Sequence, residues 1–364
     1  MHHACGTPLS GQKANDIKQM RSDFFRRPTR RRVLTILAAA AAGGLTAPPA
    51  GLAASRGIGD HHWEGTALGA DARISLQGFP VAEARALLAF CQAEMARLEA
   101  VFSLHDPASA LSRLNREGRL DAAPAEMLEL IGISRRIHAL SGGAFDPSVQ
   151  PLWDLYAAHF RDRTAGSAGP SAAAIEAARA RVGFGRVAVA GRSIALAPGM
   201  SLTLNGIAQG YITDRVADIL RAAGARHVLV DLGEFRALGP KLDGHPWRIG
   251  LRDAVRPLHL ADAVPLSGRA LATSGGYGTP FDASGRHHHL FDPRTGRSAG
   301  RHLSASVVAP AATEADALST AFYVMDRPSI VAVLKEMPEI GVRLVGLDGA
   351  VFLAGAWPVA PSPA

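Results

Sequence analysis

Asp316 and Thr320 place a carboxylate and a hydroxyl four residues apart, in a segment whose apolar spacing predicts a helix over residues 314–325. Residues four apart share one face of a helix, so the two side chains can act together. Both are hard oxygen ligands, which suit a magnesium ion that keeps some of its waters and also binds substrate phosphates. A structural interpretation stays open, in which Asp316 interacts with the helix dipole and the Thr320 hydroxyl bonds to the helix backbone.

Three consecutive histidines, His287, His288 and His289, form the second candidate group. Successive residues of an extended segment point to opposite faces, so the three rings do not converge on one metal ion. An imidazole that projects into a cleft can instead accept a proton during catalysis. We therefore expect one histidine to act as a base, rather than all three to act as metal ligands.

Two glycine-containing segments interrupt apolar runs. In residues 204–211 (L-N-G-I-A-Q-G-Y) a predicted strand passes through Gly206 into a predicted helix, whose N-terminal N–H groups and positive dipole suit a phosphate. The spacing is neither a Walker nor a Rossmann pattern, and close packing of strand on helix would require the same glycines. In residues 142–147 (G-G-A-F-D-P), Asp146 is fixed by the proline after it, which fits either a ligand-binding loop or a turn after a capped helix.

The elements that must position these residues follow from hydrophobic periodicity. Helices are expected at residues 81–102, 109–115, 125–140, 172–182, 206–223 and 314–325, with a last helix and a hairpin inside 329–353. Strands are expected at 73–77, 201–204, 227–232 and 304–309, with a hairpin over 187–197 and several short strands between 247 and 273. Helices and strands mix without a strict βαβ rhythm. This pattern predicts an α+β fold with mixed sheets and packed helices, built as one two-lobed unit.

The net charge of +7 lies in the N-terminal segment rather than in the body of the chain. Residues 1–56 hold nine Lys or Arg and two Asp, and the rest of the chain has equal numbers of basic and acidic residues. A protein that binds nucleic acid or an anionic membrane would need a basic patch on its folded part. The composition therefore argues against both of these functions.

The basic segment has the layout of an export signal. Arg30, Arg31 and Arg32 precede a short apolar run and a zone of small residues that ends near residue 55. The arginine stretch resembles the twin-arginine signal, and the run of about 13 apolar residues is shorter than the roughly 20 that span a bilayer. We expect residues 1–55 to be a cleaved twin-arginine-type signal peptide and residues 56–364 to work in the periplasm; the alternative is a retained membrane anchor.

Taken in order along the chain, the motifs resemble the ApbE family of flavin transferases. The resemblance covers almost all of residues 56–364. It rests on Glu64-Gly65-Thr66; Phe102-Ser103-Leu104-His105-Asp106-Pro107; Gly143-Ala144-Phe145-Asp146-Pro147; Asn205-Gly206-Ile207-Ala208-Gln209-Gly210-Tyr211 with Asp214-Arg215; Thr273-Ser274-Gly275; His289-Leu290-Phe291-Asp292-Pro293-Arg294-Thr295-Gly296; and Ala315-Asp316-Ala317-Leu318-Ser319-Thr320. Each motif alone is weak, whereas all of them in this order are specific.

The resemblance implies an FAD:protein FMN transferase that uses Mg²⁺ and takes FAD as its substrate. It implies that Asp316, Thr320 and the backbone carbonyl of Gly206 bind the magnesium ion and that His289 is the catalytic base. Contacts to FAD are implied for Glu64, His105, Ala144, Phe145, Asp146, Thr203, Gln209 and Leu290. The implied acceptor is a Ser or Thr hydroxyl in an exposed loop of an exported or membrane electron-transfer flavoprotein, and AMP is the leaving group.

The chain departs from the family pattern around the flavin rather than at the metal. The family usually has Lys at the position of Gln209, Asp at Thr203, Met at Glu64 and an aromatic residue near His105, and a Gly-Gly-Asp-like stretch is here Gly233-Glu234-Phe235. An imidazole can stack on a flavin, but with less area than a tyrosine. The departures therefore bear on FAD affinity and rate more than on the class of reaction.

Three alternatives remain open at this point. A protein of the same fold could bind FAD without turning it over, or could use water as the nucleophile and act as an FAD pyrophosphatase that gives FMN and AMP. A serine hydrolase with Ser274 as nucleophile is the third, but the chain has no Gly-x-Ser-x-Gly elbow. A binding protein would leave FAD intact and consume no acceptor, and a requirement for a protein hydroxyl separates the transferase from the pyrophosphatase.

Overall fold

The computed structural model describes residues 58–162, 164–256 and 258–358. The expected signal peptide, residues 1–55, lies outside the described residues. The described residues belong to one compact unit. None of the described helices is long and apolar enough to cross a membrane.

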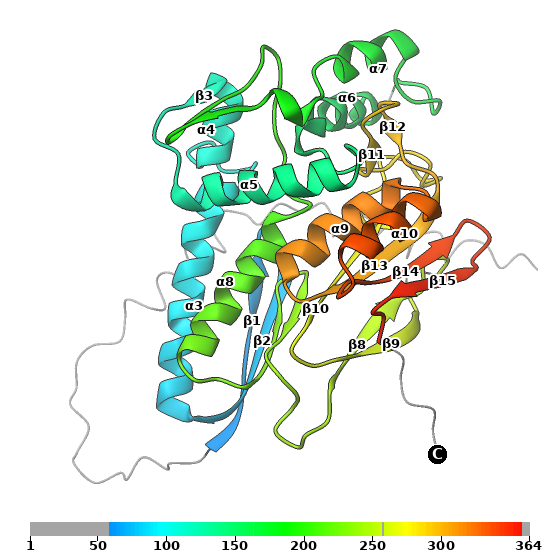
Figure 1. Cartoon of the computed structure of the whole chain (residues 1–364). Coiled ribbons are helices and arrows are strands. Elements are labelled where there is room, and N and C mark those ends of the chain that lie inside the picture. The colour runs from blue at the N-terminus through cyan, green and yellow to red at the C-terminus, as the bar shows by residue number, and fades with distance from the viewer. Residues whose placement is uncertain (1–57, 163, 257, 359–364) are drawn as a thin grey trace, which may run out of the picture. The chain divides into compact units, whose positions relative to one another are not determined.

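An eight-stranded sheet is the centre of the fold (Figure 1). In spatial order its strands are β1 (Ile58–Ala67), β2 (Ala70–Pro80), β6 (His227–Asp231), β7 (Phe235–Ala237), β10 (Ala270–Gly275), β13 (His302–Ala309), β14 (Gly341–Gly346) and β15 (Val351–Gly355). Every pairing within it is antiparallel among the described strands. The α+β class is confirmed, but the expectation of mixed sheets is wrong. Hairpins join β1 to β2, β6 to β7 and β14 to β15, and such tight connections reverse the chain.

Helices cover one face of this sheet. They are α3 (Val81–Phe102), α8 (Ala208–Ala222), α9 (Ala312–Val324) and α10 (Arg327–Glu336). Helix α9 packs on β10 and β13 and is flanked by α8 and by α5 (Ala125–Leu140), so nearly all of its residues are buried. A helix that is apolar on every side belongs inside a core, which explains why α9 can carry Asp316 into the interior.

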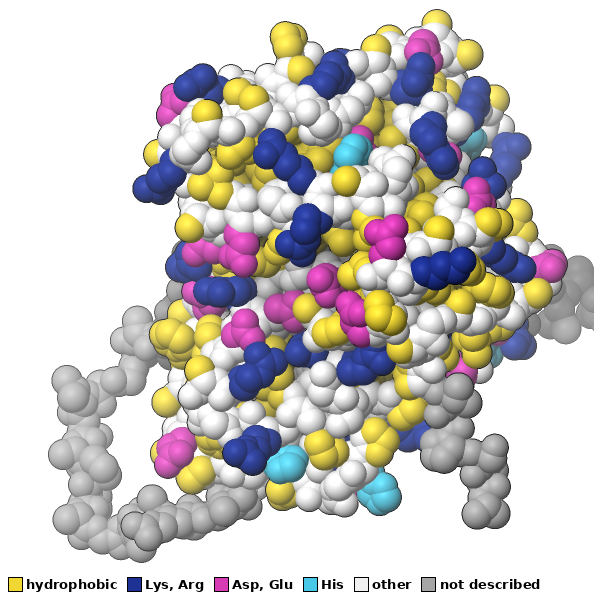
Figure 2. Space-filling view, in the orientation of Figure 1, with side chains coloured by type: hydrophobic (Ala, Val, Ile, Leu, Met, Phe, Trp, Pro, Cys, Tyr) yellow, Lys and Arg dark blue, Asp and Glu magenta, His cyan; other side chains and the backbone are white. Residues whose placement is uncertain are grey.

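The remaining elements cover the ends and the other face of the sheet. Helix α4 (Ala110–Glu117) lies beside a small sheet of β3 (Arg119–Leu120), β5 (Ser193–Ala195) and β4 (Ala188–Ala190). Helices α6 (Gln150–Arg161) and α7 (Ala172–Arg179) pack on Phe291 of the β11 (Phe291–Asp292) and β12 (Arg297–Ser298) hairpin. The hairpin of β8 (Trp247–Arg252) and β9 (Leu260–Leu266) buries Trp247 and Ile249 against β7, β10 and β13. On the face seen in Figure 2, the Lys and Arg side chains of the described residues are spread among acidic ones.

The predicted strand at residues 201–204 is absent, since these residues form no strand in the structure. Its backbone groups are bound elsewhere: the Asn115 side chain accepts a hydrogen bond from the Leu202 N–H at 2.7 Å and donates one to the Leu202 carbonyl at 2.8 Å. The Thr203 N–H donates to the Pro147 carbonyl at 2.8 Å. Because the Asn115 side chain and the Pro147 carbonyl pair with these backbone groups, the segment stays extended without a neighbouring strand. It can therefore enter the cavity described below.

Candidate active site

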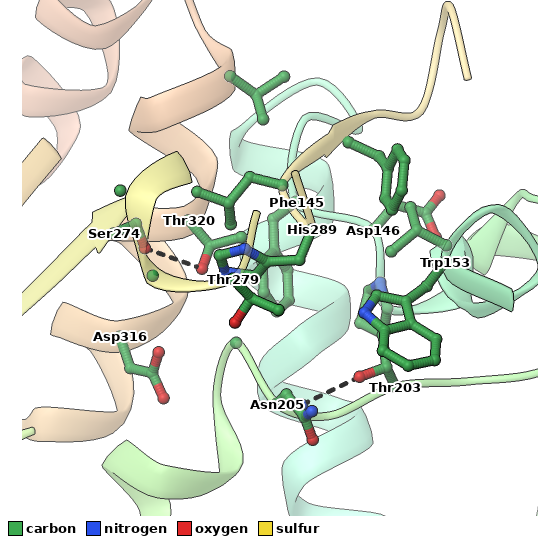
Figure 3. Close-up of a pocket in the computed structure, with 18 of the residues that line it drawn as sticks. Phe145, Asp146, Trp153, Thr203, Asn205, Ser274, Thr279, His289, Asp316 and Thr320 are labelled. Atoms are coloured by element: carbon green, nitrogen blue, oxygen red, sulfur yellow. Dashed lines mark hydrogen bonds between the residues drawn. The ribbon is translucent and has the colours of Figure 1, made fainter. Parts of the chain in front are cut away.

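A cavity of about 350 Å³ opens beside α9, and it collects residues that lie far apart in the sequence (Figure 3). Its lining comes from the loop 144–149, Trp153 of α6, residues 203–209 at the start of α8, Glu234, residues 273–279, residues 289–291, and Asp316, Thr320 and Val324 of α9. Ten of the twelve residues expected from the sequence lie here: Ala144, Phe145, Asp146, Thr203, Gly206, Gln209, His289, Leu290, Asp316 and Thr320. The expected metal ligands and the expected base therefore share one cavity.

Asp316 is held by the first turn of α8. Its Oδ2 accepts a hydrogen bond of 3.0 Å from the Gly210 N–H, and its side chain is only 4% exposed. Burial raises the pKa of the Asp316 carboxyl, although the Gly210 hydrogen bond acts in the opposite direction. A buried carboxylate without a cation is unfavourable, so this position suits a bound metal ion better than an empty cavity.

Thr320 and Gly206 meet at the same place. A Cβ on Gly206 would lie 2.9 Å from the Thr320 Oγ1, so only glycine lets the backbone come this close to the hydroxyl. The Ser274 hydroxyl shares hydrogen bonds with Ser319 at 2.8 Å and Thr320 at 3.3 Å. Asp316, Thr320 and the backbone of Gly206 line the same cavity, and a carboxylate, a hydroxyl and a backbone carbonyl are oxygen donors of the kind that Mg²⁺ prefers.

The charged side chains among the described residues that line the cavity are all acidic. Its described lining contains three carboxylates, on Asp146, Glu234 and Asp316, but no Lys or Arg. Burial raises the pKa of the Glu234 carboxyl well above its ordinary value, and the charges of Asp316 and Asp231 raise it further. No group of three or more His, Cys, Asp or Glu in the described residues is placed to hold a metal ion. A cation here would therefore need hydroxyl and carbonyl oxygens as well as carboxylates.

The three consecutive histidines have three different environments. The His287 ring lies 3.7 Å from the Asp282 carboxylate, and the His288 ring hydrogen-bonds the Ala299 carbonyl at 3.0 Å. His289 faces the cavity, and its Nδ1 is buried with no hydrogen-bond partner among the described residues. Burial, with a smaller effect from His288, lowers the pKa of His289 to about 4. This imidazole is therefore neutral at physiological pH and able to accept a proton.

The loop that contains Asp146 is fixed by the carboxylate itself. Asp146 Oδ1 accepts a hydrogen bond from the Ser148 N–H at 2.8 Å, and Oδ2 accepts one from the Phe184 N–H at 3.1 Å. The His138 Nδ1 also contacts the Phe145 carbonyl at 2.8 Å. The turn interpretation is confirmed for this segment, which also lines the cavity; its contact with a ligand stays a prediction.

Trp153 is a lining residue that the sequence analysis missed. It belongs to α6, which was not predicted, and its ring packs edge-on against Phe281 with centroids 5.9 Å apart. In Figure 3 Trp153 lies across the cavity from Asp316, with His289 between them in the view. The hint in the sequence was a lone tryptophan six residues after Pro147, but only the fold brings it to the cavity. It gives the cavity an aromatic wall opposite the oxygen ligands.

Glu64 and His105 do not line the cavity. Glu64 is an exposed residue of β1, 3.5 Å from Arg73 of the neighbouring strand. His105 is exposed in the loop after α3, where its N–H donates to the Ser103 hydroxyl at 3.0 Å. Their contacts to FAD stay predictions that this cavity does not test.

Carboxylate, hydroxyl and carbonyl oxygens suit a divalent cation that also binds phosphates, and the neutral imidazole in the same cavity can accept a proton. The ApbE family model matches residues 68–344 of the chain. The chain therefore belongs to the ApbE family, as the order of its motifs indicated.

Relatives with a named activity support this assignment. The chain is 30% identical over 300 residues to the FAD:protein FMN transferase of Klebsiella pneumoniae strain 342, covering 79% of this chain and 85% of that protein. It is 32% identical over 305 residues to the FAD:protein FMN transferase of Treponema pallidum, covering 75% and 80%. The crystal structure of the ApbE protein of Thermotoga maritima matches with a TM-score of 0.72 and 30% identity, over 80% of this chain and 96% of that one.

Proposed function

We propose that this chain is an FAD:protein FMN transferase, which moves the FMN half of FAD to a Ser or Thr hydroxyl of another protein in a Mg²⁺-dependent reaction. Family membership and relatives named for this activity support the transfer of FMN from FAD to a protein. The magnesium requirement and the hydroxyl acceptor are inferred from the site.

The observation that carries the metal requirement is the charge of the cavity. The pyrophosphate of FAD is anionic, yet the described lining has three carboxylates and no Lys or Arg. Two negative partners in a poorly solvated space repel one another strongly unless a cation lies between them. When bound there, Mg²⁺ would neutralise charge on the pyrophosphate. Asp316, Thr320 and the Gly206 carbonyl are the residues that would hold it.

The remaining chemistry belongs to the chain's own residues. His289 would take the proton of the acceptor hydroxyl, whose oxygen attacks the phosphorus of the FMN half. The new P–O bond joins FMN to the acceptor, and the bond between this phosphorus and the AMP oxygen breaks, so AMP leaves. Such a transfer depends mainly on positioning and charge stabilisation, and the fixed loop 144–149 and Trp153 would orient the flavin half.

The acceptor and the compartment follow from the sequence expectations. We propose that residues 1–55 direct export and that the mature chain acts in the periplasm on an exported or membrane electron-transfer flavoprotein. An exposed loop with a Ser or Thr would reach the cavity, whereas a hydroxyl inside a folded core would not. Comparing the N-terminus of the secreted chain with residue 56 tests the export proposal.

Product analysis separates transfer from its two alternatives. We would incubate the mature chain with FAD and Mg²⁺, with and without a protein that carries a Thr in an exposed loop, and quantify AMP, free FMN and FAD by chromatography. The proposal predicts AMP only with the acceptor, in an amount equal to the protein-bound flavin. Equal AMP and free FMN without acceptor would identify a pyrophosphatase, and intact bound FAD would identify a binding protein.

A further inference from the structure

Glu234 is a buried carboxylate that the proposed reaction does not yet use. It stands at the turn between β6 and β7, lines the cavity that contains Asp316, and is only 8% exposed. Its Oε2 has no hydrogen-bond partner among the described residues. Buried polar atoms are nearly always paired, so an unpaired carboxylate oxygen inside a cavity indicates a partner that binds there.

No basic side chain among the described residues neutralises Glu234. Gln209 packs against the preceding Gly233, where a Cβ would lie 2.7 Å from the Gln209 Nε2, and this side chain brings no charge. Arg236, on β7, lies 3.5 Å from the Asp214 carboxylate instead. The charges that act on Glu234 are those of Asp316 and Asp231, which are negative. A cation that enters the cavity would supply the partner that these side chains do not.

We propose that Glu234 is a second carboxylate that interacts with the divalent cation held by Asp316 and Thr320. The two carboxylates together let the protein bind this cation before FAD arrives. This inference rests on the proposed function. A site with one carboxylate usually needs substrate phosphates to complete the binding of Mg²⁺, and each further carboxylate raises the affinity for the free cation. In this chain the turn that carries the carboxylate reads Gly233-Glu234-Phe235.

The test is the binding of Mn²⁺ to the FAD-free mature chain, monitored by electron paramagnetic resonance. Displacement of the bound Mn²⁺ by Mg²⁺ then measures the affinity for Mg²⁺. Glu234→Gln keeps the shape of the side chain and removes its charge. We expect it to weaken Mn²⁺ binding by about 10- to 100-fold. Glu314→Gln is the matched control, because Glu314 lies on the same helix as Asp316 but points toward Arg136, 4.0 Å away; its Mn²⁺ affinity should equal that of the parent chain.

Thermal unfolding separates cation binding from a structural role. Without metal, Glu234→Gln should have a Tm no lower than the parent, because it replaces a carboxyl whose ionisation burial disfavours with a neutral amide of the same shape. With Mn²⁺, the rise in Tm should shrink only in this variant. An equal loss of Tm with and without metal would overturn the inference.

The affinities also distinguish the failure of this inference from a failure of the proposed function. If Glu234→Gln binds Mn²⁺ like the parent while Asp316→Asn does not, Glu234 has no role toward the cation, although the metal site stands. If the parent chain binds Mn²⁺ neither with nor without FAD, the metal-dependent function itself is wrong.

Discussion

The backbone N–H of Gly210 on α8 donates a 3.0 Å hydrogen bond to Oδ2 of Asp316 on α9. A Cβ on Gly210 would lie 2.3 Å from the Ala312 carbonyl oxygen, so the two helices touch backbone to backbone here. One turn later, Asp214 accepts hydrogen bonds of 2.8 Å from the N–H groups of Ala312 and Thr313 and thereby caps α9. The contact that packs the two helices thus also positions the carboxylate expected to bind the metal.

Gly210→Ala should therefore lower both the free energy of unfolding and the affinity of the site for a metal ion. The added methyl has no space, and overpacking of this kind costs about 1–3 kcal/mol. Urea unfolding should show this loss, and Mn²⁺ titration should show weaker binding. Gly132→Ala is the control: at this exposed position of α5 the Cβ meets nothing within 4 Å, so the variant should gain about 0.5–1 kcal/mol. An unchanged midpoint in Gly210→Ala would show that the close contact is absent.

Asp316→Asn should abolish metal-dependent transfer while the fold survives. The amide oxygen can still accept from Gly210, but it lacks the charge that offsets a divalent cation. Steady-state transfer at increasing Mg²⁺ measures the effect, with circular dichroism as the check on folding. Parent-like transfer with the same magnesium dependence would remove Asp316 from the metal site.

His289→Ala should separate catalysis from binding. Loss of a general base costs roughly 10²–10⁴-fold in rate, and FAD affinity should change little because the ring contributes a proton acceptor rather than the pyrophosphate site. Single-turnover transfer and FAD fluorescence titration give the two quantities. A collapse of FAD affinity with little change in rate would make His289 a binding residue.

The pH dependence follows from the lowered pKa of His289. Burial lowers this pKa to about 4, and only the neutral ring can accept a proton. Activity that depends on His289 is therefore fully present at neutral pH and is lost as pH falls through about 4, below the ordinary imidazole pKa of about 6.5. The kcat/KM profile at saturating Mg²⁺ measures this limb. A limb near pH 6.5 that disappears in His289→Ala would contradict the burial of the base.

Trp153 should hold the flavin through ring stacking. It lines the cavity across from the oxygen ligands, and a stacked aromatic pair contributes about 0.5–1.5 kcal/mol beyond its buried area. Trp153→Ala should weaken FAD binding by about tenfold or more, and Trp153→Phe should recover much of it. Equal FAD affinity in all three proteins would place the isoalloxazine elsewhere.

The long amphipathic helices could be predicted from the sequence because their periodicity repeats over several turns. Helices α3 and α5 have the expected bounds, Val81–Phe102 and Ala125–Leu140. Strands were harder, since residues 201–204 have a strand-like pattern but are bonded by the Asn115 side chain. The two-residue strand β3 carries no periodic signal at all.

The meeting of Asp316, Thr320 and His289 in one cavity could be predicted because these residues lie in short motifs with chemical meaning. Glu234 and Trp153 could not, since neither belongs to a spacing pattern that indicates a ligand. From the sequence, Glu234 is only a turn residue, and the fold places it in the cavity. Trp153 reaches the cavity because it lies on α6, a helix that follows the Asp146 turn. Tertiary packing, rather than local sequence, brings both into the cavity.

The most direct test of the central claim is covalent flavin on an acceptor protein. The mature chain would be incubated with FAD, Mg²⁺ and a protein that carries a Thr in an exposed loop, and the acceptor would then be examined by denaturing gel fluorescence and by intact mass. The account predicts a fluorescent acceptor heavier by one FMN, only when FAD and Mg²⁺ are both present and the Thr is intact. An unmodified acceptor, with its loop shown to be flavinylated by a related transferase, would contradict the account.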